Sequence, residues 1–282
     1  MKVLLTGAAG QVGSELALTL VHHDLVALDR QQLDITDRSE VIDTTRTVRP
    51  DVIINSAAWT STDQCEDNPD QAELINGRAV GHLVEAAGEV GARVVQISTD
   101  YVFDGTLDRP YVETDEPRPR SAYGRSKLLG ERSTRPEDTI IRTSWVVGRF
   151  GSNMAKTILR LVSERPVLRF VTDQVGHPTL AHDLATMITR LVDEERNGLF
   201  HVTNQGAVSW FTFAREVLAA AGLDPERIEP VLAADLDPPQ TAPRPANSVL
   251  ENAALADAGI PLLPDHREPL ARLVTELLEL PG

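Results

Sequence analysis

A tyrosine and a lysine four residues apart, Tyr123 and Lys127, stand in the segment "SAYGRSK". That spacing places both side chains on one face of a helix. Tyrosine has a reference pKa of about 10, and a neighbouring ammonium group stabilises its phenolate; lowering that pKa by about three units takes roughly 4 kcal/mol. The pair can then transfer a proton near neutral pH. Such pairs are common on helices, so the assignment needs a second observation.

Reactive side chains also follow the apolar segment 93–99, "RVVQIST". Ser98 and Thr99 end this expected strand, and Asp100 and Tyr101 come directly after it. Ligands of an open parallel sheet bind at the carboxyl ends of its strands. We therefore predict that the strand opens into an active site, in which Thr99 bonds a substrate carbonyl oxygen and Asp100 a neighbouring hydroxyl group.

Three glycines, Gly7, Gly10 and Gly13, lie between an expected strand at 2–7 and an expected helix at 11–23. One glycine permits a tight turn, another lets the backbone approach a pyrophosphate, and a third lets helix and strand pack closely. Backbone amides at the helix start then favour an anion. Spaced glycines alone are weak evidence, but their place directly after the first strand predicts a dinucleotide-binding site.

The second expected strand, 24–29, ends in Asp29 and is followed by Arg30. An acidic residue at this place usually bonds the adenosine ribose hydroxyls and favours NADH, whereas an arginine can accept the 2′-phosphate of NADPH. The alternative interpretation is that Asp29 is an ordinary acidic residue of the turn at the end of this strand. The sequence therefore predicts a nicotinamide cofactor, NADPH or NADH, and leaves the choice between them open.

The first 145 residues alternate apolar runs with amphipathic segments. The expected strands are 2–7, 24–29, 51–58, 93–99 and 139–145, and the expected helices are 11–23, 38–48, 71–90 and 121–133. Short apolar strands that alternate with helices predict a parallel sheet covered on both faces. We therefore expect an α/β fold with a doubly wound, Rossmann-like sheet.

After residue 145 the expected strands and helices alternate less regularly. The expected helices there are 153–164, 180–194, 210–222 and 267–280, and the expected strands are 167–172 and 198–204. We divide the chain into a dinucleotide-binding domain, residues 1–145, and a smaller, intertwined α/β lobe, residues 146–282, which can exchange elements with the first.

The composition excludes some classes of protein. A net charge of −15 argues against a nucleic-acid binder, although local arginines can still bind an anionic substrate. No apolar run reaches the length of a membrane span, so no membrane association is expected. The single cysteine, Cys65, fits a reducing cytoplasm, and we expect it to be an inert surface thiol.

Thr99, Tyr123 and Lys127 match the catalytic trio of the extended short-chain dehydrogenase/reductase superfamily. Within it the chain resembles the dTDP-4-dehydrorhamnose reductase family almost from end to end. The motifs that carry the resemblance, in the family's order, are "TGAAGQVGSEL", "LDITD", "INSAAWTSTDQCE", "STDYVFDG", "YGRSK", "RTSWVVGRFGSNM", "DQVGHPT", "SWFTFA" and "RPANSVL". "STDYVFDG" and "RTSWV" are specific to this family and its near relatives.

The resemblance implies roles for individual residues. It implies that the cofactor contacts Gly7, Gly10, Gln11, Val12, Gly13, Asp29, Arg30, Asp34, Ile35, Ala57, Ala58, Thr60, Tyr101, Tyr123 and Lys127. It implies that a dTDP-sugar contacts Thr99, Asp100, Tyr123 and Trp145. Arg244 can reach the diphosphate of that substrate, because arginine suits bidentate phosphate contact. From the residues alone, Trp145 is equally consistent with the core, and Arg244 with a tie that fixes the C-terminal loop.

The implied reaction is hydride transfer from NAD(P)H to the C4 ketone of dTDP-4-dehydro-L-rhamnose, with Tyr123 as the proton donor. Lys127 would hold the nicotinamide ribose and lower the Tyr123 pKa. Two positions depart from the family: Trp59 stands where Tyr or His is frequent, and Gln64 where Lys is frequent. Some members use Mg²⁺ between subunits, and Glu15 matches one such position; no full ligand set is evident, so no metal site is assigned. A homodimer is compatible with the sequence.

Two other functions remain open. A nucleotide-sugar epimerase or dehydratase would share the fold, but a dehydratase needs an Asp-Glu pair after the strand-four threonine, where this chain has Asp100 and Tyr101. A non-catalytic NADP-binding regulatory subunit could lose the tyrosine or the lysine, and this chain keeps both. The segment 173–179 is expected to be a structured turn, in which His177 has a structural role.

Overall fold

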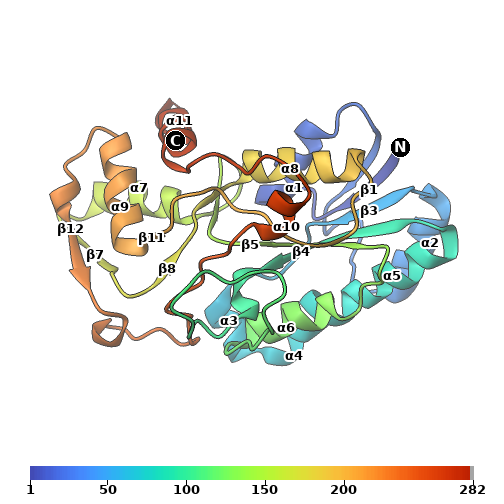
Figure 1. The fold of residues 1–282 in the computed structure, drawn as a ribbon, viewed down its shortest axis with the longest axis horizontal. Helices are drawn as coiled ribbons and strands as arrows, with labels where there is room; N and C mark the ends of the chain where they lie inside the picture. The colour runs from blue at the N-terminus through green and yellow to red at the C-terminus, as the bar shows by residue number, and fades with distance from the viewer. Residues whose placement is uncertain (280–282) are drawn as a thin grey trace.

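The computed structural model describes residues 1–279, and within them the central element is a six-stranded sheet (Figure 1). Its strand order is β10-β5-β4-β3-β1-β2, and every neighbouring pair is parallel. The strands are β1 (Lys2–Thr6), β2 (Asp24–Leu28), β3 (Val52–Asn55), β4 (Arg93–Thr99), β5 (Thr139–Thr143) and β10 (Gly198–His201). The prediction of a doubly wound α/β fold is confirmed.

Helices cover both faces of this sheet, as Figure 1 shows. One face carries α2 (Arg38–Val48), α5 (Ala79–Val90) and α6 (Ala122–Glu131), and the other carries α1 (Gln11–Thr19) and α8 (Ala181–Asp193). Successive strand residues point to opposite faces. Leu4 and Ile53 accordingly belong to the apolar cluster with α2 and α5, whereas Leu5 and Ile54 belong to the cluster with α1 and α8.

The strand order fixes where a ligand can bind. β2 and β3 lie on opposite sides of β1, so the chain changes direction across the sheet at this point. Such a switch point leaves a crevice at the carboxyl ends of the strands. The loops that follow β1, β2, β3 and β4 all open into this crevice, which makes it the expected place for the predicted residues.

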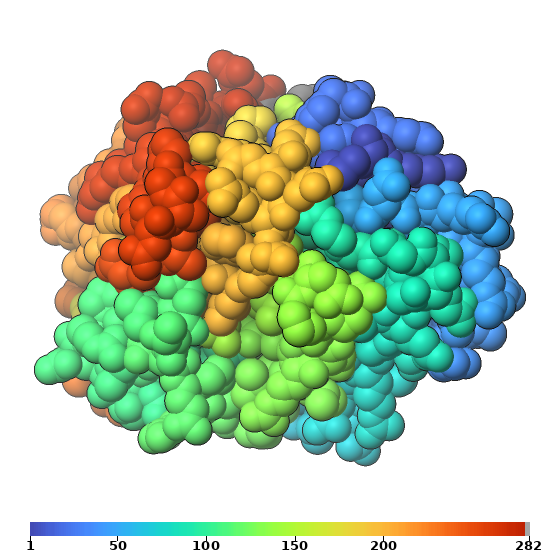
Figure 2. Space-filling model, turned by 45° about the vertical axis from the view of Figure 1, so that its right-hand side comes forward, coloured from blue at the N-terminus to red at the C-terminus, as the bar shows by residue number. Residues whose placement is uncertain are grey.

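Two elements from the second half of the chain join the first half. β10 extends the main sheet beside β5, and α8 runs parallel to α1. Side-chain contacts hold α8 along its whole length, from His182 against Glu15 to Thr189 against Thr19. Figure 2 shows the gold surface of α8 and the residues after it lying against the blue and teal surface of the first half. The two parts of the chain on either side of the predicted division at residue 145 therefore share an interface to which both contribute strands and helices.

The remaining elements form the smaller lobe and the connections. They are α3 (Thr62–Asp67), α4 (Pro69–Glu73), η1 (Leu74–Arg78), η2 (Asp100–Val102), β6 (Val146–Val147), α7 (Met154–Glu164), β7 (Leu168–Val171), β8 (Val175–Gly176), β9 (Thr179–Leu180), β11 (Val208–Ser209), α9 (Trp210–Ala220), η3 (Pro225–Arg227), β12 (Ile228–Val231), η4 (Ala233–Asp235), α10 (Ala253–Asp257) and α11 (Arg267–Glu279). The predicted last residue of the final helix, Leu280, lies outside the described residues. A second apolar core forms between α7, α9, β7 and α11.

Two expectations from the sequence are wrong in detail. The single helix expected over 71–90 is divided by the π-helical turn η1. Cys65 is fully buried and donates a hydrogen bond from its thiol to the Trp59 carbonyl oxygen at 3.5 Å, so it is not on the surface. Burial raises the pKa of this thiol to about 11, which keeps it protonated and inert as predicted. No helix within residues 1–279 is both long enough and apolar enough to cross a membrane.

Candidate active site

Two adjoining cavities form a continuous cleft at the carboxyl edge of the sheet. The outer cavity, about 590 Å³, lies above β1 and β2, and the inner cavity, about 570 Å³, lies above β4 and β5. Both are lined by Gly10, Ser56, Ala57 and Ala58. The cleft therefore extends from the residues after β2, across the glycine loop, to those after β5.

The glycine loop has the geometry that close approach to a phosphate requires. Gly7 has φ +71, and a Cβ atom there would lie 2.5 Å from the Ala57 nitrogen. A Cβ atom on Gly13 would lie 2.2 Å from the Gly7 carbonyl oxygen, so only glycine lets α1 pack against the loop. Gly10 is the N-cap of α1 and offers no side-chain cap. The first amides of this helix thus face the cleft, where they favour an anion.

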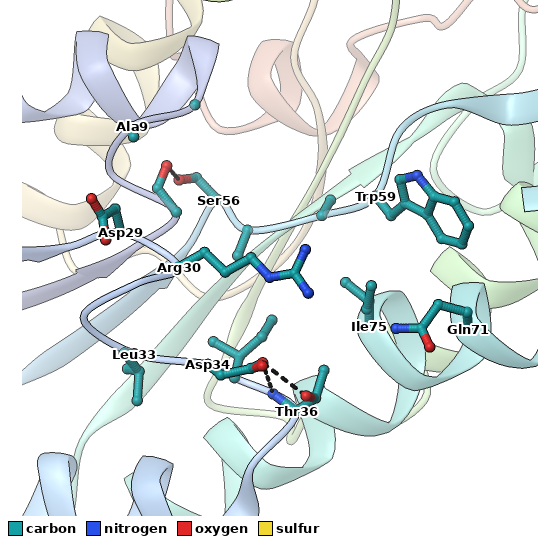
Figure 3. A pocket seen from close by; sticks show the side chains of 15 residues that line it. Ala9, Asp29, Arg30, Leu33, Asp34, Thr36, Ser56, Trp59, Gln71 and Ile75 are labelled. Atoms are coloured by element: carbon teal, nitrogen blue, oxygen red, sulfur yellow. Dashed lines mark hydrogen bonds between the residues drawn. The ribbon is translucent and has the colours of Figure 1, made fainter. Parts of the chain in front are cut away.

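The outer cavity contains the residues predicted for the adenosine end, as Figure 3 shows. Asp29 accepts hydrogen bonds from the backbone amides of Gln31 and Gln32, at 2.8 and 3.1 Å, through its Oδ1 atom. Its carboxylate is thus fixed by its own turn, which leaves Oδ2 for a ligand. The Arg30 side chain extends across the cavity. Asp34 accepts from both the amide and the hydroxyl of Thr36, and these bonds lower its pKa.

The two positions that depart from the family pattern contact each other. The indole nitrogen of Trp59 donates a hydrogen bond to Gln64 Oε1 at 3.3 Å, and Trp59 lines the outer cavity. The backbone of Trp59 is held by Asn76, whose amide group also bonds the Ser126 hydroxyl next to Lys127. The two substitutions therefore form one contact at the cleft wall and leave the catalytic residues in place.

The inner cavity brings together the residues predicted for the chemistry. Of the residues predicted from the sequence, those that line it are Gly10, Gln11, Val12, Ala57, Ala58, Thr60, Thr99, Asp100, Tyr101, Tyr123, Lys127 and Trp145. Gly7, Asp29, Arg30, Asp34 and Ile35 line the outer cavity, and Gly13 and Arg244 line neither. The predicted residues that line the two cavities lie on, or in the loops after, β1 to β5, and on α1 and α6, which meet only in the folded chain.

Tyr123 and Lys127 lie on one face of α6, as their spacing predicts, and both side chains are buried. Burial raises the pKa of Tyr123, so its hydroxyl is held in the protonated form. Burial also lowers the pKa of Lys127 to about 8, and its Nζ atom donates to the Ile97 carbonyl oxygen at 2.6 Å. The raised Tyr123 pKa is opposite to the direction expected from a lysine neighbour: burial is its largest cause, and the nearby carboxylate of Asp100 raises it further.

Asp100 is the most unusual carboxylate of the cleft. It is 2% exposed, its Oδ1 atom accepts a bond from the Thr99 hydroxyl at 2.9 Å, and its Oδ2 atom has no hydrogen-bond partner among residues 1–279. Burial raises its pKa to about 6. A buried polar atom without a partner costs free energy, which a ligand hydroxyl would recover.

Asparagine at this position should make the free energy of unfolding less dependent on pH. A carboxyl group whose pKa rises from 3.8 to about 6 on folding destabilises the native state increasingly as pH rises through that window, by about 3 kcal/mol in total. We expect the stability difference between Asp100→Asn and the wild type to grow in favour of the variant from pH 4 to pH 7. Urea unfolding at both pH values measures it; an equal difference at both would contradict the raised pKa.

A pair of tryptophans closes the substrate end of the cavity. The rings of Trp145 and Trp210 stack with 3.6 Å between centroids at 10°. Trp145 has φ +44. A Cβ atom on Gly176 would lie 2.7 Å from the Trp145 ring, so the indole can take this position only because residue 176 is glycine. Sequence reasoning assigned no role to Trp210, although this residue belongs to the motif "SWFTFA" at the start of an expected helix.

Arg244 lies outside both cavities and forms an ion pair with Asp63. Its guanidinium donates to the two carboxylate oxygens at 2.9 and 3.2 Å, and to the Ala242 carbonyl oxygen. This side chain therefore ties the C-terminal loop to α3. This contact agrees with the tie considered from the sequence, and the contact with a diphosphate stays a prediction.

The segment 173–179 is held by hydrogen bonds to residues beside the cleft and in the second half of the chain. The Ser144 hydroxyl donates to the His177 carbonyl oxygen at 2.7 Å, and the His177 ring contacts the Thr203 hydroxyl at 3.1 Å. Burial lowers the pKa of His177 to about 4, so the ring is neutral. Asp173 accepts a bond from the Ala233 amide. These contacts agree with the structural role expected for this turn.

Glu15 does not fit a magnesium site within this chain. Its side chain is 6% exposed, and its Oε2 atom lies 3.2 Å from His182 Nδ1. Mg²⁺ requires an octahedral set of oxygen ligands. Among the residues that the structure describes, Glu15 belongs to no group of three metal-binding side chains.

The profile of the RmlD substrate binding domain family matches residues 1–279. The chain belongs to the RmlD family. It is 41% identical over 298 residues to a dTDP-4-dehydrorhamnose reductase of Burkholderia thailandensis, with 99% of each chain covered. It is 42% identical to the spore coat polysaccharide biosynthesis protein SpsK of Bacillus subtilis, covering 98% of this chain and 97% of that protein.

A solved structure of an RmlD family member agrees with the fold throughout. The dTDP-4-dehydrorhamnose reductase of Bacillus anthracis in complex with NADP superimposes with a TM-score of 0.93, at 37% identity, and covers 98% of this chain and 99% of that one. The resemblance found in the sequence motifs is therefore confirmed over the whole length of the chain.

Proposed function

We propose that the protein is an NAD(P)H-dependent oxidoreductase that reduces the C4 ketone of dTDP-4-dehydro-L-rhamnose to give dTDP-L-rhamnose. The observation that carries this proposal is that Thr99, Tyr123 and Lys127 line one cavity together with the glycine loop. A relative that is named for this reaction is 41% identical to the chain. The cleft's outer cavity fits the adenosine end of a dinucleotide, and its inner cavity fits the nicotinamide and the sugar.

Four residues of the inner cavity have distinct roles in the proposed reaction. The bound cofactor would supply a hydride to C4, and the Tyr123 hydroxyl would give its proton to the oxygen that becomes the new hydroxyl group. A tyrosine with a raised pKa is protonated at neutral pH, which suits a proton donor in a reduction. The Thr99 hydroxyl, which here donates to Asp100 Oδ1, would donate to the same oxygen instead. The free Oδ2 atom of Asp100 would accept a bond from a neighbouring sugar hydroxyl. Trp145 would pack against the sugar ring.

The absorbance of the reduced nicotinamide tests the proposal directly. The purified protein is mixed with dTDP-4-dehydro-L-rhamnose and with NADPH or NADH in turn. We expect one cofactor to be oxidised for each sugar reduced. If the protein binds the cofactor but does not consume it, the reductase assignment is wrong and a regulatory subunit is favoured. An epimerase would convert the sugar without net loss of the absorbance.

Arg30 should set the preference between the two cofactors. Its guanidinium lies in the outer cavity beside Asp29, where the adenosine ribose would bind. A charged hydrogen bond contributes about 1.5–3 kcal/mol, so we expect Arg30→Ala to lower the NADPH-to-NADH ratio of kcat/KM by about 10- to 100-fold. Arg78→Ala, at a side chain that is 65% exposed, is the control and should leave the ratio unchanged. An unchanged ratio in Arg30→Ala would exclude this role.

The homodimer and the cytoplasmic location stay predictions.

A further inference from the structure

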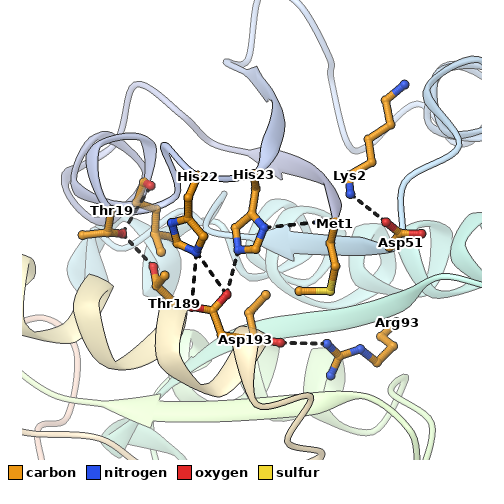
Figure 4. A network of polar contacts seen from close by, with 11 residues as sticks. Met1, Lys2, Thr19, His22, His23, Asp51, Arg93, Thr189 and Asp193 are labelled. Atoms are coloured by element: carbon orange, nitrogen blue, oxygen red, sulfur yellow. Dashed lines mark hydrogen bonds and ion pairs between the residues drawn. The ribbon is translucent and has the colours of Figure 1, made fainter.

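Two adjacent histidines and an aspartate form a compact cluster, which Figure 4 shows. His22 and His23 lie in the turn between α1 and β2, and Asp193 is the last residue of α8. The Nε2 atom of His23 lies 2.8 Å from Asp193 Oδ1, and the Nε2 atom of His22 lies 3.2 Å from each carboxylate oxygen. The imidazole rings are 4.1 Å apart between centroids. Two nitrogen donors and a carboxylate therefore converge on one point.

The spacing of these donors suits a small metal ion. One ligand atom from each residue lies within 4.8 Å of the other two. Nitrogen and oxygen donors about 2.0–2.1 Å from a tetrahedral zinc ion lie roughly 3.3 Å from one another. The observed separations of 2.8 and 3.2 Å are close to that value, so small movements would admit the ion.

The chemistry of the donors selects the class of metal. Imidazole nitrogens suit Zn²⁺, Ni²⁺ and related ions, whereas Mg²⁺ and Ca²⁺ prefer oxygen ligands alone. The side chain of His22 is 51% exposed and that of Asp193 is 40% exposed, so the metal can enter from solvent and keep a water as its fourth ligand. The His23 side chain is only 6% exposed and gives the site one fixed donor.

We propose that His22, His23 and Asp193 bind a divalent transition-metal cation of the zinc type. The ion would join the C-terminal end of α8, which belongs to the second half of the chain, to the turn before β2. The bond between Thr19 and Thr189, and the bond from Arg93 to the Val192 carbonyl oxygen, already hold this end of α8 in place.

The site lies at the amino-terminal edge of the sheet, and the cleft lies at the carboxyl edge. The five residues of β2 separate the two edges by roughly 16 Å. An ion at this distance contacts neither the cofactor nor the substrate. It stabilises the native state because it binds the folded chain in preference to the unfolded one.

Calorimetric titration of the metal-stripped protein with ZnCl2 tests the site. We expect one Zn²⁺ per chain and a higher thermal unfolding temperature in its presence, and no response to MgCl2. His22→Ala and Asp193→Asn should each weaken zinc binding by about 100-fold or more, since the loss of an outer-shell partner alone costs 10- to 100-fold. Activity should be the same in the loaded and the metal-free protein.

The control is the other histidine that links α1 and α8. His182 is 67% exposed and contacts Glu15, so His182→Ala removes a comparable imidazole and should leave zinc binding unchanged. His22 is exposed, and its replacement should leave the unfolding temperature of the metal-free protein nearly unchanged, which separates ligand loss from misfolding. Equal zinc binding by the wild type and His22→Ala, or no binding by the wild type, would overturn the proposal.

Discussion

Replacing Tyr123 by phenylalanine should lower kcat by about 100- to 10,000-fold, the usual contribution of a general acid, while NADPH still binds. The substitution removes one hydroxyl oxygen from a buried ring and leaves the ring itself in the inner cavity. Because the hydroxyl is the proton donor in the proposed reaction, the loss should fall on kcat more than on KM. Steady-state kinetics with the dTDP-sugar and a separate titration with NADPH measure both.

Tyr101 offers a matched control in the same cavity. Its ring contacts the Tyr123 ring edge to face, with 5.6 Å between centroids at 72°, and burial raises the pKa of its hydroxyl as well. Tyr101→Phe should change kcat by less than about tenfold, because this hydroxyl is not assigned the proton transfer. If both variants lost the same activity, the effect would report packing of the ring pair, and the proton-donor role of Tyr123 would be wrong.

The parts of the fold that local sequence determines agree closely with the structure. The strand expected at 93–99 is β4 with the same bounds, because its apolar run ends abruptly at reactive residues. The glycine loop and the pair on α6 also lie where their spacing predicts, since each depends on one turn or one helix face. These features suffice to place most of the predicted site residues around one cleft.

The features that the sequence did not reveal depend on contacts between distant segments. The π-helical turn η1 contains Asn76, whose side chain bonds the backbone of Trp59 and the hydroxyl of Ser126, so the break serves contacts that no local pattern shows. The ion pair between Arg244 and Asp63 likewise joins residues far apart in the chain. Trp210 contacts Trp145 only because α9 begins beside the cleft.

The high pKa of Tyr123 also follows from burial that the sequence leaves undetermined. The spacing to Lys127 predicts a charged neighbour, but the lysine itself is buried and bonded to a carbonyl oxygen. Burial is the largest cause of the raised pKa, and the nearby carboxylate of Asp100 also disfavours a phenolate. Proton donation in the reducing direction is therefore favoured over phenolate formation.

Breaking the buried ion pair beneath the active site should cost about 3–5 kcal/mol of stability, the usual result of leaving one charge without its partner. Arg142 on β5 donates to both carboxylate oxygens of Glu131 at 2.7 and 2.9 Å, and the side chains are 4% and 5% exposed. Glu131 also accepts a bond from the Ser98 hydroxyl at 2.5 Å. Arg142→Met would leave this carboxylate buried without its counter-charge, and urea unfolding at pH 7 measures the loss.

Two further variants separate the ion pair from the volume of its side chains. Arg142→Met combined with Glu131→Leu removes both charges of the pair, and it should recover much of the lost stability because the carboxylate that Arg142→Met leaves unpaired is absent. Breaking the exposed pair between Arg46 and Glu89 with Arg46→Met should cost less than about 1 kcal/mol, because solvent screens those charges. A double variant less stable than Arg142→Met would instead show that the pair itself stabilises the fold. Glu131 also raises the Lys127 pKa, so the double variant should recover stability while Lys127 loses its proton at a lower pH.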